Sequence, residues 1–229
     1  SEYQWGWYVL DPGTEQGRTN LKFLLEGLGS TVSISLISML FAMMLGIIVA
    51  MPAFSKYKSL RFFNRSYVEI VRSVPVLVLL LWVYYGLPAL FDISLNHFWA
   101  GVIALSFAES AFMAEVFRGG IRSIGDGQHE AAESLGLTYW QKMRLVIFPQ
   151  ALRLILPPLG NQFVYILKMS SLVSVIGLSE LTRRANELVV NEYLPLEIYT
   201  FLVFEYLLLI LCVSQVVRWL EKRMAYPEA

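Results

Sequence analysis

Five stretches of this chain are poor in charged residues, and each is long enough for a membrane-spanning helix. A bilayer core about 30 Å thick is crossed by about 20 mostly apolar helical residues. The first two stretches contain no Asp, Glu, Lys or Arg, and the other three contain one or two each. They cover residues 27–55, 73–91, 93–117, 154–179 and 198–217. We therefore expect an all-α membrane protein of about five transmembrane helices.

The composition supports a membrane environment over an aqueous one. Of the 229 residues, 56% are hydrophobic and 16% are charged, and the mean hydropathy is +0.56. Soluble domains are typically about 25% charged. The formal net charge is zero, which provides no general attraction to nucleic acid, so we expect no nucleic-acid partner. The single cysteine, Cys212, excludes an intramolecular disulfide.

Successive loops between the predicted spans lie on opposite sides of the membrane, and the basic residues are distributed unevenly between these two sides. Thirteen of the 18 Lys and Arg residues fall on one side, and basic residues accumulate in the cytoplasm. We therefore expect an external N-terminal segment over residues 1–25 and a cytoplasmic C-terminus. The cytoplasmic group comprises Lys56, Lys58, Arg61, Arg65, Arg72, Arg118, Arg122, Lys142, Arg144, Arg153, Arg218, Lys222 and Arg223.

One face of the first span is made of small residues three or four positions apart. Such a face lets another helix approach closely in lipid, although small residues are also common in membrane helices generally. The face comprises Thr31, Ser35, Ser38, Ala42 and Gly46.

The longest inward segment, residues 119–150, predicts a compact helical hairpin within a single transmembrane domain that covers residues 1–229. A turn at 125–127 precedes helix formers over 128–135. Gly136 is expected to end this short helix. Thr138 is expected to cap a second helix that begins near Tyr139.

The hairpin resembles the EAA loop of the membrane subunits of ABC importers. In that loop EAA is followed by three residues, Gly, nine residues, Ile, one residue, Leu and Pro; here Val146 and Phe148 replace the Ile and the Leu. The stretches RSVP (72–75) and AEVFRGGIRSI (114–124) resemble the polar amino acid branch of the family. Where that branch often reads KDTSL, this chain reads KMSSL (168–172). The residues in register with the EAA loop are Glu130, Ala131, Ala132, Gly136 and Pro149.

The resemblance implies a type I importer fold that works as a homodimer or heterodimer of permease subunits in a bacterial cytoplasmic (inner) membrane. Two ATPase subunits would bind ATP and Mg²⁺, and an external solute-binding protein would deliver an amino acid. The expected ATPase-coupling residues are Gly127, Glu130, Ala131, Ala132, Leu135, Gly136 and Pro149.

Two charged residues in the last two spans are candidates for a functional role, because ionisable groups are costly inside a membrane. Lys168 lies about 22 Å of helix from Arg153, and Glu205 lies about 20 Å from Arg218, so the two can reach a similar depth in antiparallel spans. Either they form an ion pair, or Lys168 faces a polar path and binds a substrate carboxylate.

Other polar residues in the spans could complete a substrate path. Glu109 shares a helix face with Met113, and amide and hydroxyl groups follow in the fourth span. An amino acid needs an anionic or acceptor group for its ammonium and a cationic or donor group for its carboxylate. The alternative is that each polar group only satisfies another helix. The candidate path residues are Glu109, Met113, Asn161, Gln162, Lys168, Ser170 and Glu205.

Motifs for chemistry within the chain are missing from its sequence. No GxxxxGK followed by Ser or Thr occurs, so we expect no ATP hydrolysis by this chain and no cofactor bound to it. His129 and Glu130 begin like the zinc motif HExxH, but Glu133 replaces the second His, so we expect no metal site. The functional alternatives are a secondary transporter or channel, and an intramembrane enzyme.

Overall fold

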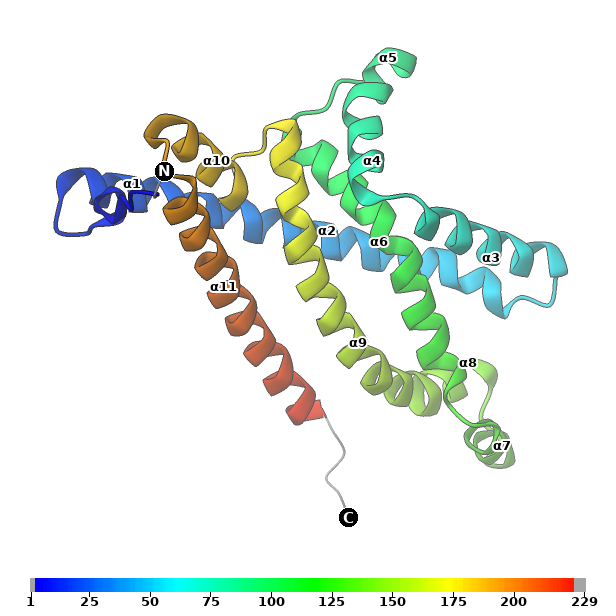
Figure 1. Ribbon diagram of the computed structural model, residues 1–229. Coiled ribbons are helices and arrows are strands. Elements are labelled where there is room, and N and C mark those ends of the chain that lie inside the picture. The colour runs from blue at the N-terminus through cyan, green and yellow to red at the C-terminus, as the bar shows by residue number, and fades with distance from the viewer. Residues whose placement is uncertain (1–2, 225–229) are drawn as a thin grey trace. The chain divides into compact units, whose positions relative to one another are not determined.

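The computed structural model describes residues 3–224, and its regular elements are helices, as the sequence predicts. Four long helices are apolar enough to cross a membrane, and a bent pair of helices adds a fifth crossing if it counts as one span. The expectation of about five spans is therefore confirmed. The four long helices are α2 (Gly27–Ala50), α6 (His97–Arg122), α9 (Phe148–Met169) and α11 (Pro195–Met224) (Figure 1).

The second predicted span differs from a single straight helix. Ser73 is the last residue of α3 (Lys58–Ser73), and the chain becomes helical again only at Val76. Proline disfavours helical dihedrals in the residue before it, and Val74, before Pro75, is extended at φ −90° and ψ 124°. The apolar stretch is therefore the second half of a bent pair. It comprises α4 (Val76–Leu81), the π-helix η3 (Trp82–Gly86) and α5 (Leu87–Phe91).

Shorter helices connect or extend these spans. Three of them, α7, α8 and η4, build the hairpin before α9, and the others lie near the N-terminus and between the long helices. Their bounds are η1 Trp7–Leu10, α1 Glu15–Leu25, η2 Met51–Phe54, α7 Asp126–Ser134, α8 Tyr139–Lys142, η4 Met143–Ile147, η5 Ser170–Ile176 and α10 Leu181–Glu192.

The chain forms two compact units, and the boundaries between them fall inside α2, α6, α9 and α11 or at Pro75. Among the described residues, the first unit comprises 3–38, 76–105 and 164–213, and the second comprises 39–75, 106–163 and 214–224. All thirteen basic residues assigned to the cytoplasmic side belong to the second unit. The other five, Arg18, Lys22, Lys168, Arg183 and Arg184, belong to the first.

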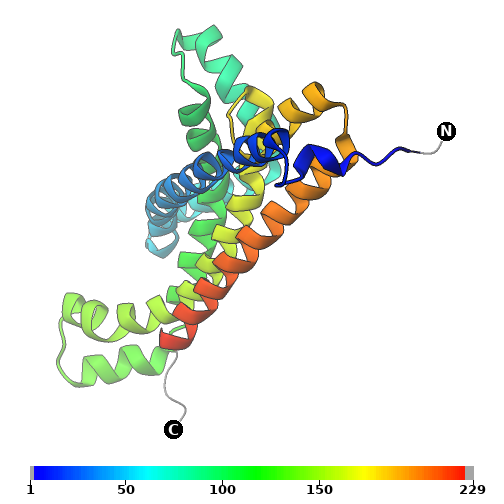
Figure 2. The same cartoon turned by 90° about the vertical axis from the view of Figure 1, so that its left-hand side faces the viewer.

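The core of the first unit packs α2 against α6 and the segment after α9. Ile34, Val102 and Val173 are buried together, and a Cβ on Gly101 would lie 2.7 Å from side-chain atoms of both Ile34 and Val173. A second cluster joins the N-terminal segment, including α1, to α10 (Figure 2), with Leu24 buried against residues of α10.

The core of the second unit packs α2 against α3 and α6. The Nδ2 of Asn64 donates to the carbonyl of Val49 at 2.6 Å and so ties α3 to α2. Gly46 lies so close to Met113 that a Cβ on the glycine would collide with it. Ala42 of the small-residue face is fully buried in this unit, and Thr31, Ser35 and Ser38 are fully buried in the first unit, as expected for a face that packs closely.

Candidate functional site

The hairpin begins with α7, which ends where the sequence predicts. Gly136 adopts a left-handed conformation with φ +73°. Its N–H donates to the carbonyl of Glu133 at 2.9 Å, and the N–H of Leu137 donates to that of Ala132 at 3.2 Å. This pair of bonds is the Schellman motif, which satisfies carbonyls at a helix end and favours glycine in the left-handed position.

The second arm begins with a capping box. The hydroxyl of Thr138 accepts a hydrogen bond from the N–H of Gln141, whose side chain accepts from the N–H of Thr138. The Nζ of Lys142 donates to Glu133 at 2.6 Å and holds the pKa of that carboxyl below its usual range. The two arms are therefore closed by local caps and by one ion pair.

The EAA residues divide between the inside and the outside of this hairpin. Ala132 is 1% exposed and packs within the unit, whereas Glu130 and Ala131 are exposed. Leu135, expected on the apolar face of the helix, is 78% exposed, and Trp140 is 79% exposed. The free surface of the hairpin thus combines a carboxylate with large apolar side chains.

Two aromatic residues on this surface, Tyr139 and Trp140, were not among the predicted site residues. Their rings pack edge to face with centroids 5.6 Å apart. Adjacent aromatics directly after a helix cap, in a loop with basic residues, were the signal that could have revealed them. Isolated exposed aromatics are unremarkable, but a cluster at the tip of a hairpin is typical of a contact surface.

Glycine and proline have different roles in the hairpin. A Cβ on Gly127 would meet no atom within 4 Å, so the chain itself does not require glycine there. Gly136 requires glycine because of its positive φ. Pro149 is the second residue of α9, which continues without a break from the π-helix η4, and its ring removes one backbone N–H from this continuous helix.

Glu109 is a buried carboxylate of the second unit that bonds one neighbouring helix. It is 1% exposed, and one carboxylate oxygen accepts a hydrogen bond from the Nε2 of Gln162, while Oε1 has no hydrogen-bond partner. The neighbouring Ser110 shares a 2.7 Å hydrogen bond with the hydroxyl of Tyr67, which was not predicted. Three helices, α3, α6 and α9, therefore supply a carboxylate, an amide and hydroxyls.

Three other predicted path residues are placed differently. Met113 is fully buried beside Gly46. Ser170 is fully buried and donates to the carbonyl of Leu167 at 2.7 Å. Asn161 is exposed. Met113 and Ser170 thus serve internal packing in this conformation.

The structure does not contain the ion pair between Lys168 and Glu205 that was one of two expectations. Lys168 is exposed and forms no ion pair within residues 3–224, whereas Glu205 is 9% exposed with both carboxylate oxygens unpartnered. Similar depth along two helices did not specify a similar orientation around them. The carboxyl group that lies near Glu205 belongs to Glu180. Glu180 accepts hydrogen bonds from the hydroxyl of Tyr206 at 2.8 Å and from a backbone N–H of α10 at 2.7 Å.

Apolar spans, buried polar groups and a capped, exposed hairpin are together typical of a multi-pass membrane transport subunit. Residues 42–226 match the family described as "Binding-protein-dependent transport system inner membrane component", and the chain belongs to this family. It is the permease subunit of an ABC importer. This membership decides against a secondary transporter, a channel or an intramembrane enzyme.

Similar proteins cover nearly the whole chain. The probable glutamine ABC transporter permease protein GlnM of Bacillus subtilis (strain 168) is 37% identical over 90% of this chain and 94% of its own length. The glutamine transport system permease protein GlnP of Escherichia coli (strain K12) is 34% identical over 89% and 94%. A solved structure described as an amino acid ABC transporter with histidines has a TM-score of 0.83 and 37% identity, covering 90% of this chain and 96% of that one.

Proposed function

We propose that this permease subunit imports a polar amino acid and receives its energy from a partner ATPase that docks on the α7–α8 hairpin. The observation that carries the proposal is the hairpin itself, in which an internal ion pair and two caps hold Glu130, Ala131 and Leu135 on a free surface. A rigid helix between two spans can transmit the closure of an ATPase without any covalent chemistry in this chain. ATP and Mg²⁺ would be bound by the partner.

The proposed orientation in the membrane has the N-terminus outside, residues 1–25 as an external segment, and residues 119–150 as the cytoplasmic coupling loop. The thirteen basic residues all lie in the second compact unit, and this clustering supports the orientation, because basic residues accumulate on the cytoplasmic side. The family description supports a bacterial cytoplasmic membrane.

A polar amino acid as substrate is supported by the names of the relatives and by the chemistry around Glu109. GlnM and GlnP are named for glutamine transport, and the solved relative is described as an amino acid transporter. Glu109 has an unpartnered oxygen that can accept a hydrogen bond from an ammonium group, and Gln162 can donate or accept. Lys168 remains a proposed contact for the substrate carboxylate, because it is exposed and forms no ion pair among the described residues.

The remaining partners follow from the same proposal. A second permease copy or a related subunit would complete the path, and an external binding protein would deliver the substrate. The apolar residues of α11, such as Val203 at 63% and Leu208 at 62% exposure, would face lipid or the second subunit.

Uptake measurements on the reconstituted complex test the proposal. The chain and its ATPase are placed in proteoliposomes, and ATP-driven uptake of radiolabelled glutamine is followed with the external binding protein present. We expect uptake that requires ATP, and a KM raised about tenfold or more by Glu109→Gln, since one charged hydrogen bond contributes about 1.5–3 kcal/mol. Glu197→Gln is the control, because Glu197 is a buried carboxylate that bonds the N-terminal segment.

Two results would count against the proposal. Uptake driven by an ion gradient without ATP would contradict the proposal that a partner ATPase supplies the energy. An unchanged KM in Glu109→Gln, or an equal rise of KM in the Glu197→Gln control, would contradict the proposed role of Glu109 in the substrate path.

A further inference from the structure

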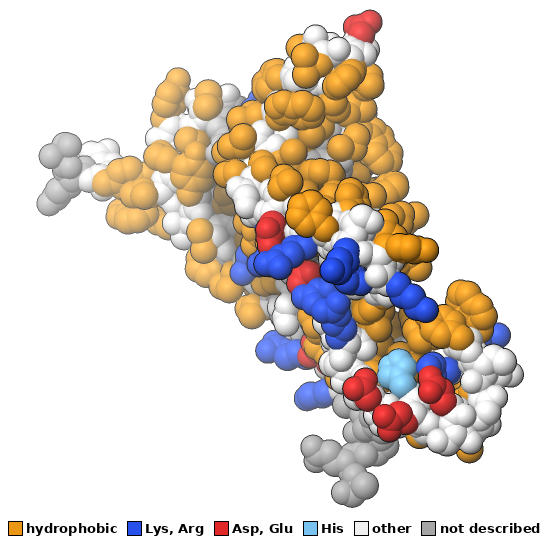
Figure 3. Space-filling view, turned by 90° about the vertical axis from the view of Figure 1, so that its right-hand side faces the viewer, with side chains coloured by type: hydrophobic (Ala, Val, Ile, Leu, Met, Phe, Trp, Pro, Cys, Tyr) orange, Lys and Arg blue, Asp and Glu red, His pale blue; other side chains and the backbone are white. Residues whose placement is uncertain are grey.

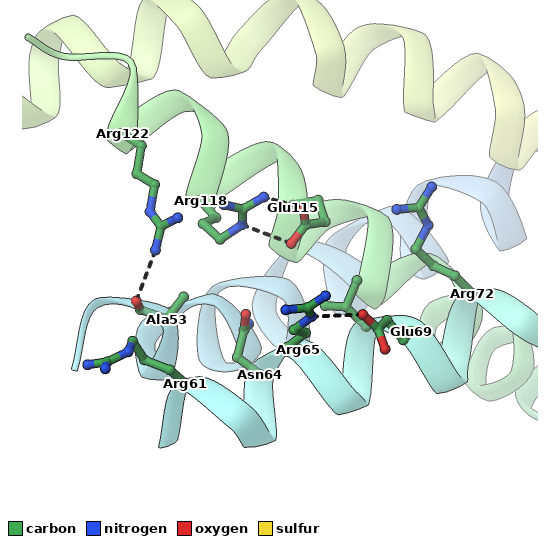
Figure 4. A pocket seen from close by; sticks show the side chains of 10 residues that line it. Ala53, Arg61, Asn64, Arg65, Glu69, Arg72, Glu115, Arg118 and Arg122 are labelled. Atoms are coloured by element: carbon green, nitrogen blue, oxygen red, sulfur yellow. Dashed lines mark hydrogen bonds and ion pairs between the residues drawn. The ribbon is translucent and has the colours of Figure 1, made fainter. Parts of the chain in front are cut away.

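A cavity of about 410 Å³ opens in the second unit between α3, η2 and the C-terminal part of α6. Its volume lies within the roughly 300–1,000 Å³ range of ligand pockets. Five arginines and two glutamates line it, a formal net charge of +3. In Figure 3 several Lys and Arg side chains gather near the middle of this face, with others further down, and Figure 4 shows the cavity from close by. The arginines are Arg61, Arg65, Arg72, Arg118 and Arg122.

Two of these arginines are neutralised by the two glutamates. Arg65 donates to Glu69 at 2.9 Å on the outer rim, where both side chains are mostly exposed. Arg118 forms a two-pronged pair with Glu115 at 2.9 and 2.5 Å, and both side chains are 30% exposed (Figure 4). The charge left over therefore belongs to the other three guanidinium groups.

Those three guanidinium groups have neutral partners. Arg61 donates to two backbone carbonyls at 2.8 and 3.0 Å, and Arg122 donates to one at 3.3 Å. Arg72 lies over the ring of Phe112, 4.8 Å from its centroid. A guanidinium has five N–H donors, so each of the three keeps donors for a further acceptor. The cavity thus presents unneutralised, forked donors.

The helix that forms one wall is suited to the surface of a membrane. Asn64, Val68 and Val71 bury one face of α3, and the three cavity arginines of this helix form its second edge. The third face exposes apolar side chains, with Phe62 72% and Ile70 65% exposed. A helix with a basic edge beside an exposed apolar strip is typical of the boundary between headgroups and acyl chains.

We propose that this cavity binds the phosphate group of an anionic phospholipid, whose acyl chains lie along the exposed apolar strip of α3. Guanidinium forks match the oxygens of a phosphate better than an ammonium point charge does. Basic pockets on the cytoplasmic side of membrane proteins hold anionic headgroups for the same reason. The apolar strip favours a lipid over free phosphate, because free phosphate has no apolar group that could contact Phe62 and Ile70.

The binding experiment uses the full chain purified in neutral detergent and native mass spectrometry with added lipid. We expect phosphatidylglycerol to bind at least about tenfold more tightly than phosphatidylcholine, and equimolar inorganic phosphate to leave it bound. Equal binding of the two lipids would overturn the proposal. Displacement by inorganic phosphate, or by the partner ATPase, would also overturn it, because the cavity would then serve a free anion or a protein. This comparison needs no variant.

Paired variants test the assignment to the cavity. R72Q/R122Q is expected to weaken phosphatidylglycerol binding about thirtyfold, since each basic residue near an anionic lipid contributes about a fivefold change. The control R218Q/R223Q also removes two charges, and Arg223 stacks on Trp219 at 4.1 Å much as Arg72 stacks on its ring. The control is expected to change binding less than twofold. An equal loss in both variants would indicate general charge attraction and would contradict the site.

Discussion

The Nζ of Lys142 lies 2.6 Å from the carboxylate of Glu133, nine residues earlier, and this contact ties the two arms of the hairpin together. Lys142 is 11% exposed at its side chain and Glu133 is 64% exposed. The lysine is therefore held in place by packing, and the glutamate reaches it from the surface.

Reversing one charge of this pair is expected to weaken energy coupling. Lys142→Glu places two carboxylates together and should lower ATP-driven uptake severalfold, because like charges push the arms apart. The double variant E133K/K142E should recover most of the uptake. Arg144→Glu is the control for an added negative charge nearby. A double variant as inactive as the single one would show that the pair does not hold the hairpin.

Alanine substitutions at Gly136 and Gly127 are expected to distinguish a glycine that the fold requires from a glycine that contacts the ATPase. Gly136→Ala should lower the free energy of unfolding by about 1–2 kcal/mol, because φ +73° crowds a Cβ. Gly127→Ala meets open space within α7 and should leave the melting temperature unchanged or slightly raised. A fall in uptake with Gly127→Ala at unchanged stability would identify Gly127 as a contact of the ATPase. Equal melting temperatures for both variants would contradict the assigned roles.

Gly160 is expected to be needed for the close approach of α9 to α11. A Cβ at this position would collide with the side chain of Val217. Gly160→Ala should therefore lower the free energy of unfolding by about 1–3 kcal/mol, as overpacking does. The second change Val217→Ala should restore part of the loss in a thermal denaturation series. Gly29→Ala, where a Cβ meets nothing within 4 Å, should be neutral or slightly stabilising, and a loss there would point to a general intolerance of α2 and α9 to alanine.

The stability of the first unit is expected to fall as the pH rises, because burial raises the pKa of Glu180 above its usual range. A raised folded-state pKa contributes stability that is fully present below the unfolded pKa and is lost as the pH passes the folded one. The melting temperature should therefore decline as the pH rises above about 4.3. Glu180→Gln, which stays neutral, should flatten this decline.

The exposed Glu15 of α1 is the control for the loss of one carboxylate from the same unit. If Glu15→Gln flattens the profile as much as Glu180→Gln does, burial of Glu180 is not the cause.

Several features of this protein could be predicted from the sequence because they depend on neighbours a few residues away. The length of apolar stretches determined the long helices, since a membrane span needs about 20 apolar residues. Gly136 and Thr138 determined the ends of the hairpin helices, since backbone sterics and caps act within one turn. The break in the helix before Pro75 also has a local cause, the effect of proline on Val74. The prediction of a single span over residues 73–91 rested on the lack of charges and did not include this effect.

Tertiary structure alone decided which polar groups meet. The bonds from Tyr67 to Ser110 and from Gln162 to Glu109 join residues 43 and 53 positions apart, and they depend on how each helix is rotated about its axis. Spacing along a helix predicts the depth of a side chain but not the neighbour it faces. For this reason Lys168 and Glu205, predicted at similar depth, do not pair.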